Sequence, residues 1–394
     1  MIASSSYGAL SATSANTIKG NAPWFTGQSG AKKLGFVVDG TPYSENLNNI
    51  NPSVIKEFNA GLKLSDFTVT SLTASDFSPT VDYADADGDL AHPTTPFSMS
   101  PRTFVWKDRN GTTITDYNQT LGCGSGLNLP LTLRITLPDV KVRSRYGNPS
   151  ESIPTPLVQE YKIGTATGIC FAKPNSLYFI GSATPQAIGG GYNSDQFDPV
   201  NGFKASLTTK FPTTGFSGAE FTLIMTSNAS DYTFSSNDSA VEVDTTGKVT
   251  LNSKPSGAVT IKAIFNNDTN QVHYYTFNPT SVWVRPTGTS SNGNYAWAKT
   301  QCGGASRIPT RANLTNAPEH IIATYYTRAV GGGVFGEWGK TGSTIYPSSQ
   351  WNSVFGFYWT RESHSSGRKF TVHCLNGEQA EFYTYISHRV ACLE

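Results

Sequence analysis

The stretch that decides the fold is Tyr295-Ala296-Trp297-Ala298-Lys299-Thr300-Gln301-Cys302-Gly303-Gly304, followed two residues later by Arg307-Ile308-Pro309-Thr310-Arg311-Ala312-Asn313-Leu314. Residues 295–302 favour a short helix. A second helix is expected to begin at residues 316–319, because Pro318 suits a first helical turn and Glu319 suits its positive end. Its apolar face would carry Ile321, Ile322, Tyr325 and Tyr326.

The composition of the rest of the chain favours strands. Charged residues make up 14% of the 394 residues, aromatic residues make up 12%, and the net charge is +1. Glycine, serine, threonine, asparagine and proline are abundant, as in strands joined by turns, and the length suggests two to four domains. No basic surplus indicates nucleic acid, and no apolar run could span a membrane. The first six residues do not resemble a signal peptide, so we expect a piece of a longer protein.

Two boundaries divide the chain, one near Lys173 and one near Pro286. Residues 132–137 alternate in the way that half-buried strands do. Residues 240–251 predict a strand, a tight turn at Gly247 and a second strand, and residues 258–265 predict another. Residues 287–293 are short and polar, and we interpret them as a hinge. We therefore predict domains at residues 1–173, 174–286 and 287–394, with residues 1–45 as an embellishment or the end of a preceding domain.

Five cysteines lie along the chain, and no pair has the C-x-x-C spacing of a zinc or redox site. Their distribution predicts disulfides between Cys123 and Cys170 and between Cys302 and Cys392, which indicates an oxidising, extracellular environment. Cys374 is left over, and we interpret it as a small buried thiol.

The opening stretch resembles the start of a C-type-lectin-like domain, in which a first helix ends in a cysteine and an R-L/I-P-T turn leads into the second helix. Residues 358–360, 370–372, 376–378 and 390–392 resemble its closing strands, whose terminal cysteine returns to the first helix. The region before residue 286 resembles bacterial immunoglobulin-like repeats. The expected fold is mostly β: tandem immunoglobulin-like sandwiches, then an α+β lectin-like domain, in a rod.

This order of domains resembles the intimin/invasin adhesins, and within them most closely the invasin E type. The resemblance implies a monomeric passenger on the bacterial surface, with an outer-membrane β-barrel preceding it. It also implies that the last domain meets a host-cell receptor, whose identity the sequence does not reveal.

Calcium binding has little support in the sequence. Residues 287–394 contain no aspartate, and Trp351-Asn352-Ser353 stands where the resembled lectins have W-N-D. The missing aspartates also argue against an integrin-binding carboxylate, although a glutamate could replace it. Asp85, Asp87 and Asp89 form a possible weak calcium loop, but they equally suit a turn. We predict no cofactor, no metal and no enzymatic activity, since no catalytic motif occurs and His373 and Cys374 point to opposite faces of a strand.

Candidate partner-binding residues lie in the expected long loop, residues 330–351, and in a polar hairpin, residues 361–368. They are Trp338, Lys340, Trp351, Arg361, Glu362 and Arg368. Aromatic side chains with a few charges suit protein recognition, although the two tryptophans could instead form a second core. The function we expect is an adhesin tip that binds a host protein without calcium, with the sandwiches as a rigid spacer. A lectin that stacks sugars on aromatic rings and a purely structural spacer with a capping domain are the alternatives.

Overall fold

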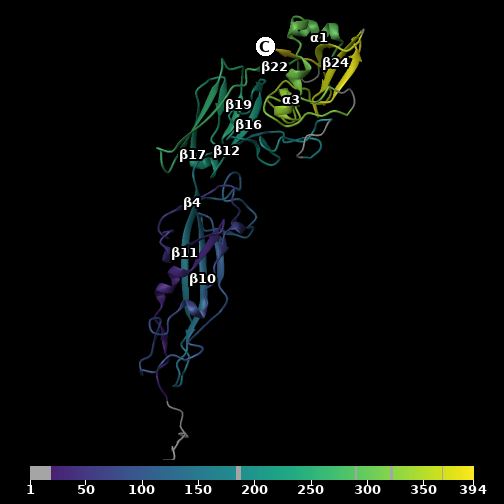
Figure 1. Cartoon of the computed structure of the whole chain (residues 1–394). Coiled ribbons are helices and arrows are strands. Elements are labelled where there is room, and N and C mark those ends of the chain that lie inside the picture. Colours follow the sequence, from purple (N-terminus) through teal and green to yellow (C-terminus); the bar gives the residue numbers. More distant parts are fainter. Residues whose placement is uncertain (1–18, 183–187, 289–290, 320–322, 366) are drawn as a thin grey trace, which may run out of the picture. The chain divides into compact units, whose positions relative to one another are not determined.

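The computed structural model describes residues 19–182, 188–288, 291–319, 323–365 and 367–394. The chain forms two compact units: unit 1 comprises Met1–Gln119 and Asn128–Thr165, and unit 2 comprises Thr120–Leu127 and Ala166–Glu394. Strands are the main regular elements of both units, and the labelled helices belong to the C-terminal part (Figure 1). The predicted mostly-β class is confirmed. Residues 1–18 of the predicted embellishment lie outside the described residues.

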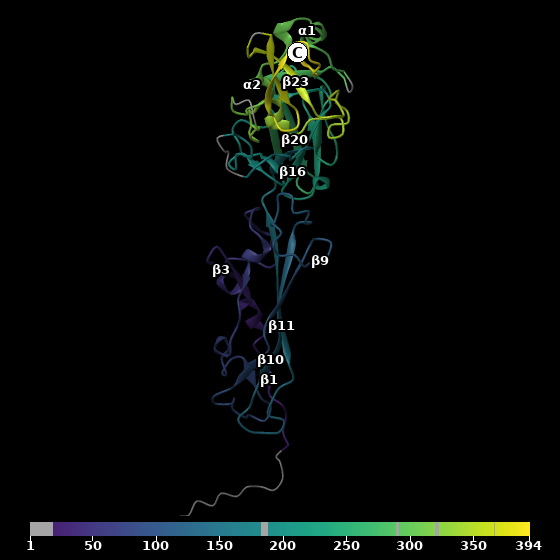
Figure 2. The ribbon, with the colours of Figure 1, turned by 90° about the vertical axis from the view of Figure 1, so that its right-hand side faces the viewer.

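Unit 1 is built on a long antiparallel pair, β10 (Leu131–Val142) and β11 (Thr155–Thr165), labelled in Figure 2. Leu131, Leu133, Ile135 and Leu137 are buried while the residues between them are more exposed, as the alternation predicts. The largest sheet has the order β4-β11-β10-β8-β9, with β7 beside β10; β3-β2-β5 and β1-β6 form two smaller sheets. The other elements are β1 (Trp24–Phe25), η1 (Gln28–Lys33), β2 (Gly35–Val38), β3 (Thr41–Ser44), η2 (Glu45–Leu47), β4 (Lys56–Phe58), η3 (Leu64–Asp66), β5 (Thr68–Val69), η4 (Ala74–Asp76), β6 (Tyr83–Ala84), β7 (Phe97–Met99), β8 (Thr103–Lys107) and β9 (Thr113–Ile114).

Aromatic side chains join the sheets of unit 1. The ring of Phe36 on β2 lies 5.6 Å from that of Tyr161 on β11, and the ring of Phe67 lies 5.3 Å from that of Trp106 on β8. The buried hydroxyl of Tyr161 donates to the carbonyl oxygen of Leu34 at 2.6 Å, which satisfies a polar group inside the core.

The first part of unit 2 is a sandwich of a six-stranded sheet, β13-β14-β12-β16-β19-β18, and a three-stranded sheet, β17-β20-β21. The strand pair predicted at residues 240–251 is confirmed as β18 and β19, and Gly247 between them has φ of 78°. The strand predicted at residues 258–265 is confirmed as β20. The elements are β12 (Ile169–Pro174), β13 (Phe197–Asp198), β14 (Gly202–Lys204), β15 (Thr214–Gly215), β16 (Ala219–Met225), η5 (Ala229–Asp231), β17 (Tyr232–Ser236), β18 (Val241–Val243), β19 (Lys248–Leu251), β20 (Val259–Phe265), β21 (Val272–Phe277) and β22 (Val282–Pro286).

The C-terminal part of unit 2 carries the helices and a second three-stranded sheet, β23-β24-β25. The helix predicted at residues 295–302 is confirmed as α1, whose buried residues are Tyr295, Ala298 and Cys302. The elements are α1 (Tyr295–Cys302), η6 (Ala305–Arg307), α2 (Arg311–Leu314), α3 (Gly333–Trp338), β23 (Phe357–Ser363), β24 (Arg368–His373), β25 (Gln379–Tyr383) and β26 (Ala391–Leu393).

The second helix begins earlier than the position of Pro318 predicted. α2 follows the R-I-P-T turn directly, and the hydroxyl of Thr310 caps it by accepting the backbone N–H of Asn313 at 3.1 Å. The prediction of a helix from Asn316 is wrong. The amide of Asn316 instead pairs with the backbone N–H and carbonyl of Thr327, which ties this stretch to a later segment of the chain. Ile321 and Ile322 lie outside the described residues.

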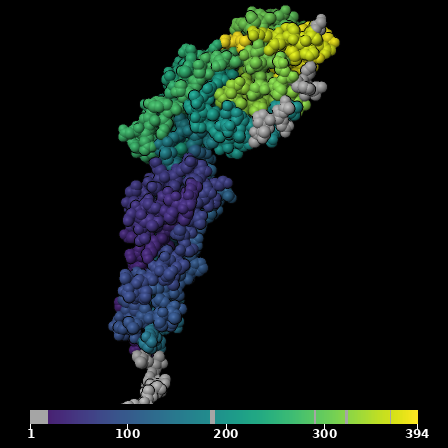
Figure 3. Space-filling view, in the orientation of Figure 1, coloured from purple at the N-terminus to yellow at the C-terminus, as the bar shows by residue number. Residues whose placement is uncertain are grey.

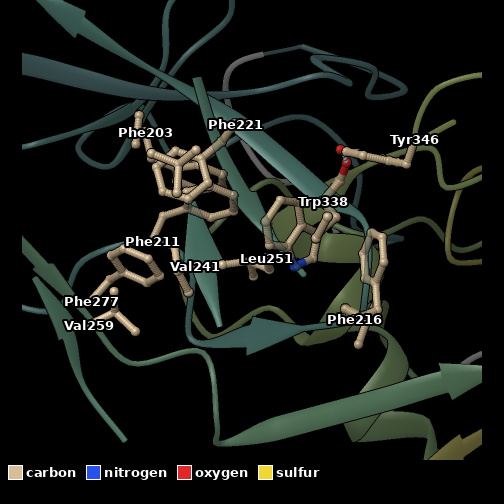
Figure 4. Packing of buried hydrophobic residues seen from close by; sticks show 14 of the residues in the cluster. Phe203, Phe211, Phe216, Phe221, Val241, Leu251, Val259, Phe277, Trp338 and Tyr346 are labelled. Carbon is tan, nitrogen blue, oxygen red and sulfur yellow. Dashed lines mark hydrogen bonds between the residues drawn. The ribbon is translucent and has the colours of Figure 1, made fainter. Parts of the chain in front are cut away.

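The residues on the two sides of the predicted hinge share one core. β22 pairs with β26, and α3 packs against β15. Trp338 of α3 lies among Phe211, Phe216 and Tyr346, with ring centroids 4.8, 5.3 and 5.9 Å away (Figure 4). In the space-filling view this unit forms one continuous body (Figure 3). The segment 287–293 therefore joins two parts of one unit, and the division at Pro286 into two domains stays a proposal.

A buried polar network strengthens this junction. The carboxylate of Glu337 accepts hydrogen bonds from the backbone N–H and the hydroxyl of both Thr213 and Thr214, and from the N–H of Gly331. The guanidinium of Arg328 donates to the carbonyl oxygens of Ser176, Tyr178 and Glu337. Burial raises the pKa of Glu337, against these hydrogen bonds, which lower it. Such satisfied networks specify one packing of the two parts.

Among the described residues, no helix is both long enough and apolar enough to cross a bilayer.

Candidate adhesive surface

Three exposed large side chains of the C-terminal part cluster where β25 ends. Tyr383 is 42% exposed, Tyr385 is 70% exposed and Ile386 is 37% exposed. β24 and β25 pair so that Arg368 lies opposite Tyr383, and the N–H of Thr384 donates to the carbonyl oxygen of Gly367 at 2.9 Å. Two strands and the turns beside them therefore hold these side chains on one rigid base.

Arg368, Tyr383 and Tyr385 form a stacked set that we call the Arg–Tyr ladder. The guanidinium carbon of Arg368 lies 4.2 Å from the ring centroid of Tyr383, and its Nη2 donates to the Tyr383 hydroxyl at 2.9 Å. The rings of Tyr383 and Tyr385 are nearly parallel, 10° apart, with centroids separated by 5.3 Å. Each side chain is thus positioned before any partner arrives, which lowers the entropy cost of binding.

Acidic and imidazole groups hold the base of the ladder. The Nη1 of Arg368 donates to a carboxylate oxygen of Glu381 at 2.6 Å, and His364 contacts the other oxygen. Hydrogen bonds with Tyr383 and Glu381 raise the pKa of Arg368. Because Glu381 neutralises Arg368, the ladder is an amphipathic surface rather than a strongly cationic one. Tyrosine and arginine are the side chains enriched in binding hot spots.

The structure separates the predicted partner-binding residues into two groups. Trp338 and Trp351 have no exposed surface, and the indole Nε1 of Trp338 donates to the carbonyl oxygen of Thr214. A buried side chain cannot meet a partner on the folded surface, so the packing supports the core alternative for both tryptophans. Lys340 is half-buried, with its ammonium 4.3 Å from the ring centroid of Phe355.

The hairpin residues lie nearer to solvent. Arg361 is exposed, and Arg368 belongs to the ladder. Glu362 is engaged inside the domain, because its carboxylate accepts the N–H of Arg311 at 2.9 Å, at the start of α2. Tyr383, Tyr385 and Ile386 were missed by the sequence reasoning. Their signal was the alternation Tyr-Thr-Tyr after a strand, which places two tyrosines on one face.

The aspartate-rich segment of unit 1 is a turn. One carboxylate oxygen of Asp85 accepts the backbone N–H groups of Asp87 and Asp89, and Gly88 has φ of 78°. Asp87 accepts the side-chain N–H of Asn21 at 3.0 Å. Among the described residues, no group of three or more histidine, cysteine, aspartate or glutamate side chains could hold a metal ion.

Two residues that could suggest catalysis are packed. The thiol of Cys374 is 1% exposed, and burial raises its pKa to about 11, so the reactive thiolate is scarce at neutral pH. His388 is enclosed by Phe357, Trp359 and Phe382, and burial lowers its pKa to about 4. Neither group is placed or charged as a nucleophile or a base would be.

Both predicted disulfides are present. Cys302 of α1 bonds to Cys392 of β26, which ties the first helix to the last strand. Cys123 bonds to Cys170 of β12, and both lie in unit 2, because the segment Thr120–Leu127 belongs to unit 2 although its neighbours in sequence belong to unit 1. Cys374 is the buried free thiol that the sequence predicts.

Comparisons with known proteins identify relatives of this chain. Residues 195–277 match the family model described as invasin, domain 4. The chain is 31% identical over 169 residues to invasin of Yersinia enterocolitica, a match that covers 42% of this chain and 19% of that protein. It is 29% identical over 188 residues to the inverse autotransporter adhesin YeeJ of Escherichia coli (strain K12), covering 46% of this chain and 7% of that protein. The chain thus spans less than a fifth of these relatives.

Two solved structures are similar at low identity. The crystal structure of invasin, described as a bacterial integrin-binding protein, has 19% identity and a TM-score of 0.42, covering 79% of this chain and 53% of that chain. A C-terminal intimin fragment in complex with the translocated intimin receptor has 17% identity and a TM-score of 0.37, covering 79% and 92%. The family model and the two sequence relatives support membership of the intimin/invasin family.

Proposed function

We propose that this chain is the distal part of a bacterial surface adhesin, and that the Arg–Tyr ladder binds a protein on the host-cell surface without calcium. The ladder carries the proposal, because it combines exposure with a rigid arrangement of Arg368, Tyr383 and Tyr385. The related adhesin and the integrin-binding relative support attachment as the activity.

The charge chemistry of the C-terminal part supports independence from calcium. Calcium binding needs several carboxylate and carbonyl oxygens at one point. Residues 287–394 have six glutamates and no aspartate. Of these glutamates, Glu337, Glu362 and Glu381 are engaged by hydrogen bonds within the domain. Unit 1, with its long β10–β11 pair, would act as a stiff spacer.

A glycan is the second candidate partner, because Tyr385 is 70% exposed and a sugar ring could stack on an open aromatic face. The experiment measures attachment of the whole chain to host cells. The cells are untreated, treated with a chelator, enzymatically deglycosylated, or trypsinised. We expect attachment to be lost only after trypsin. Loss on chelation would contradict calcium independence, and loss on deglycosylation would favour the lectin.

The ladder is tested by Tyr385→Ala, with Tyr274→Ala as the matched control. Tyr274 of β21 is 61% exposed and lies outside the ladder. We expect Tyr385→Ala to weaken attachment at least about tenfold, as a hot-spot tyrosine would. The control should attach like the parent. Equal attachment of both variants would remove the ladder from the proposal, and a parent that does not attach at all would favour the structural spacer.

A further inference from the structure

A group of unpaired cations lies on the C-terminal part of unit 2. Residues 287–394 contain nine lysines and arginines against six glutamates, so this part is basic although the whole chain is nearly neutral. Four of these cations come from separate elements and form what we call the basic face. They are Lys299 of α1, Arg307 of η6, Arg361 of β23 and Lys369 of β24.

Contacts between the elements bring these cations together. The ammonium of Lys369 donates to the carbonyl oxygen of Arg361 at 2.7 Å, and it lies 4.9 Å from the ring centroid of Tyr295, which begins α1. The Nη1 of Arg361 reaches the carbonyl oxygen of Ser306, the neighbour of Arg307, at 3.5 Å. Burial lowers the pKa of Lys369, the charge of Glu362 raises it, and the charge of Lys299 lowers it, which shows that the two ammonium groups lie near enough to repel each other.

The nearby acids form their ion pairs with cations outside this face. Glu362 and Glu319 both pair with Arg311, Glu381 pairs with Arg368, and Glu394 pairs with Arg285. Within the part of the chain that the structure describes, none of the four cations forms an ion pair. Like charges held side by side without an ion-pair partner cost stability, and an anionic ligand would lower that cost.

We propose that the basic face binds a sulfated polysaccharide. The cations lie on four separate elements rather than around one point, which suits a linear chain of regularly spaced anions better than a single small anion. Arg307 and Arg361 present guanidinium groups, which pair with sulfate and carboxylate through two parallel hydrogen bonds. Lys369 is held in place by Arg361 and by the hydroxyl of Ser363.

The proposed binding of the polysaccharide does not depend on the Arg–Tyr ladder, so it is tested separately from the proposed attachment to a host protein.

The experiment measures binding of the whole chain to immobilised heparin over a range of salt concentrations. Chemically desulfated heparin and vesicles containing phosphatidylserine serve as comparison ligands. We expect heparin to bind more tightly than either, with an affinity that falls steeply as salt rises.

The test variant is Lys299→Gln with Arg361→Gln, because both side chains are exposed. The control is Lys173→Gln with Lys262→Gln, which removes the same charge from the sandwich strands β12 and β20. We expect the test variant to bind heparin at least about fivefold more weakly, as the loss of two exposed charge contacts predicts. The control, Tyr385→Ala and the charge-retaining Lys299→Arg should bind like the parent.

Three outcomes would overturn the proposal. The parent could fail to bind heparin, it could bind desulfated heparin or the anionic vesicles at least as tightly, or the test and control variants could bind equally. Thermal unfolding of the test variant, matched to that of the parent, ensures that a loss of binding reflects lost charge and not lost fold.

Discussion

The indole Nε1 of Trp338 in α3 donates a hydrogen bond to the carbonyl oxygen of Thr214 in β15, at 3.0 Å. A side chain of the helical part thus satisfies a backbone hydrogen-bond acceptor of the sandwich. Its ring fills the space between Phe211 and Phe216. The two parts of unit 2 depend on each other for their core.

Trp338→Ala should therefore act on stability rather than on attachment. Removing a fully buried tryptophan leaves a cavity and an unpaired carbonyl, so we expect the free energy of unfolding to fall by about 3–5 kcal/mol. Chemical denaturation of the variant checks this, with Tyr274→Ala as an exposed aromatic control. Attachment of the still-folded fraction should equal that of the parent. Reduced attachment at unchanged stability would show that Trp338 contacts a partner after all.

Arg368→Lys should weaken attachment without unfolding the protein. The guanidinium of Arg368 bonds to Glu381 and Tyr383 at once, and a lysine ammonium cannot reproduce that fork while stacking on the ring. We expect attachment to fall about tenfold, the cost of losing one well-oriented hot-spot residue. Cell binding and thermal unfolding are measured on the same preparation. The control is Arg134→Lys, whose exposed pair with Glu160 lies in unit 1. Full attachment by Arg368→Lys would show that attachment does not require the hydrogen bonds of the Arg368 guanidinium to Glu381 and Tyr383.

His388 should make the protein less stable in acid. Burial lowers its pKa to about 4 in the folded state, below the usual 6.5, so the unfolded chain binds its proton first. The stabilisation is full above about pH 6.5 and is lost as the pH falls through about 4. Because the ring is only partly shielded from solvent, we expect a loss of roughly 1–2 kcal/mol.

The measurement is the free energy of unfolding at pH 7 and pH 4 for the parent and for His388→Phe. Phenylalanine suits the enclosure by Phe357, Trp359 and Phe382 and cannot titrate. The variant should lose less stability between the two pH values than the parent. Identical pH dependence of the parent and His388→Phe would rule out His388 as the cause.

Asp85→Ala should destabilise a turn without changing any response to calcium. The carboxylate accepts two backbone N–H groups, so its removal should cost about 1 kcal/mol of the stability of unit 1. Isothermal titration of the parent with calcium should give no binding heat, and millimolar calcium should leave its melting temperature unchanged. Calcium-dependent stabilisation that disappears in Asp85→Ala would instead identify a weak calcium loop.

The sequence predicted those strands, turns and helices whose causes lie within a few neighbouring residues. The alternation in residues 132–137, the glycine turn at Gly247 and the helix ending at Cys302 all have short-range causes. The helix start at Asn316 failed, because the side chain of Asn316 pairs with Thr327, which lies outside any local window.

The candidate surface could be predicted only in part. Arg368 was found because it lies in a polar hairpin, but its stacking on Tyr383 depends on the register of β24 with β25. The burial of Trp338 depends on a sandwich whose contributing residues lie more than 100 positions earlier in the chain. Composition alone does not distinguish an aromatic residue of a shared core from one of a binding loop.

The Cys302–Cys392 bond also determines how the chain would carry mechanical tension. A partner that pulls on Tyr385 loads a point only seven positions before Cys392, and the sulfur bridge passes that tension directly to Cys302. Without the bridge, the segment from Cys302 to Tyr385 would carry the tension, and its unfolding would add a contour length of about 280 Å. With the bridge in place this segment bears no tension, so the connection to a cell held under flow would not lengthen.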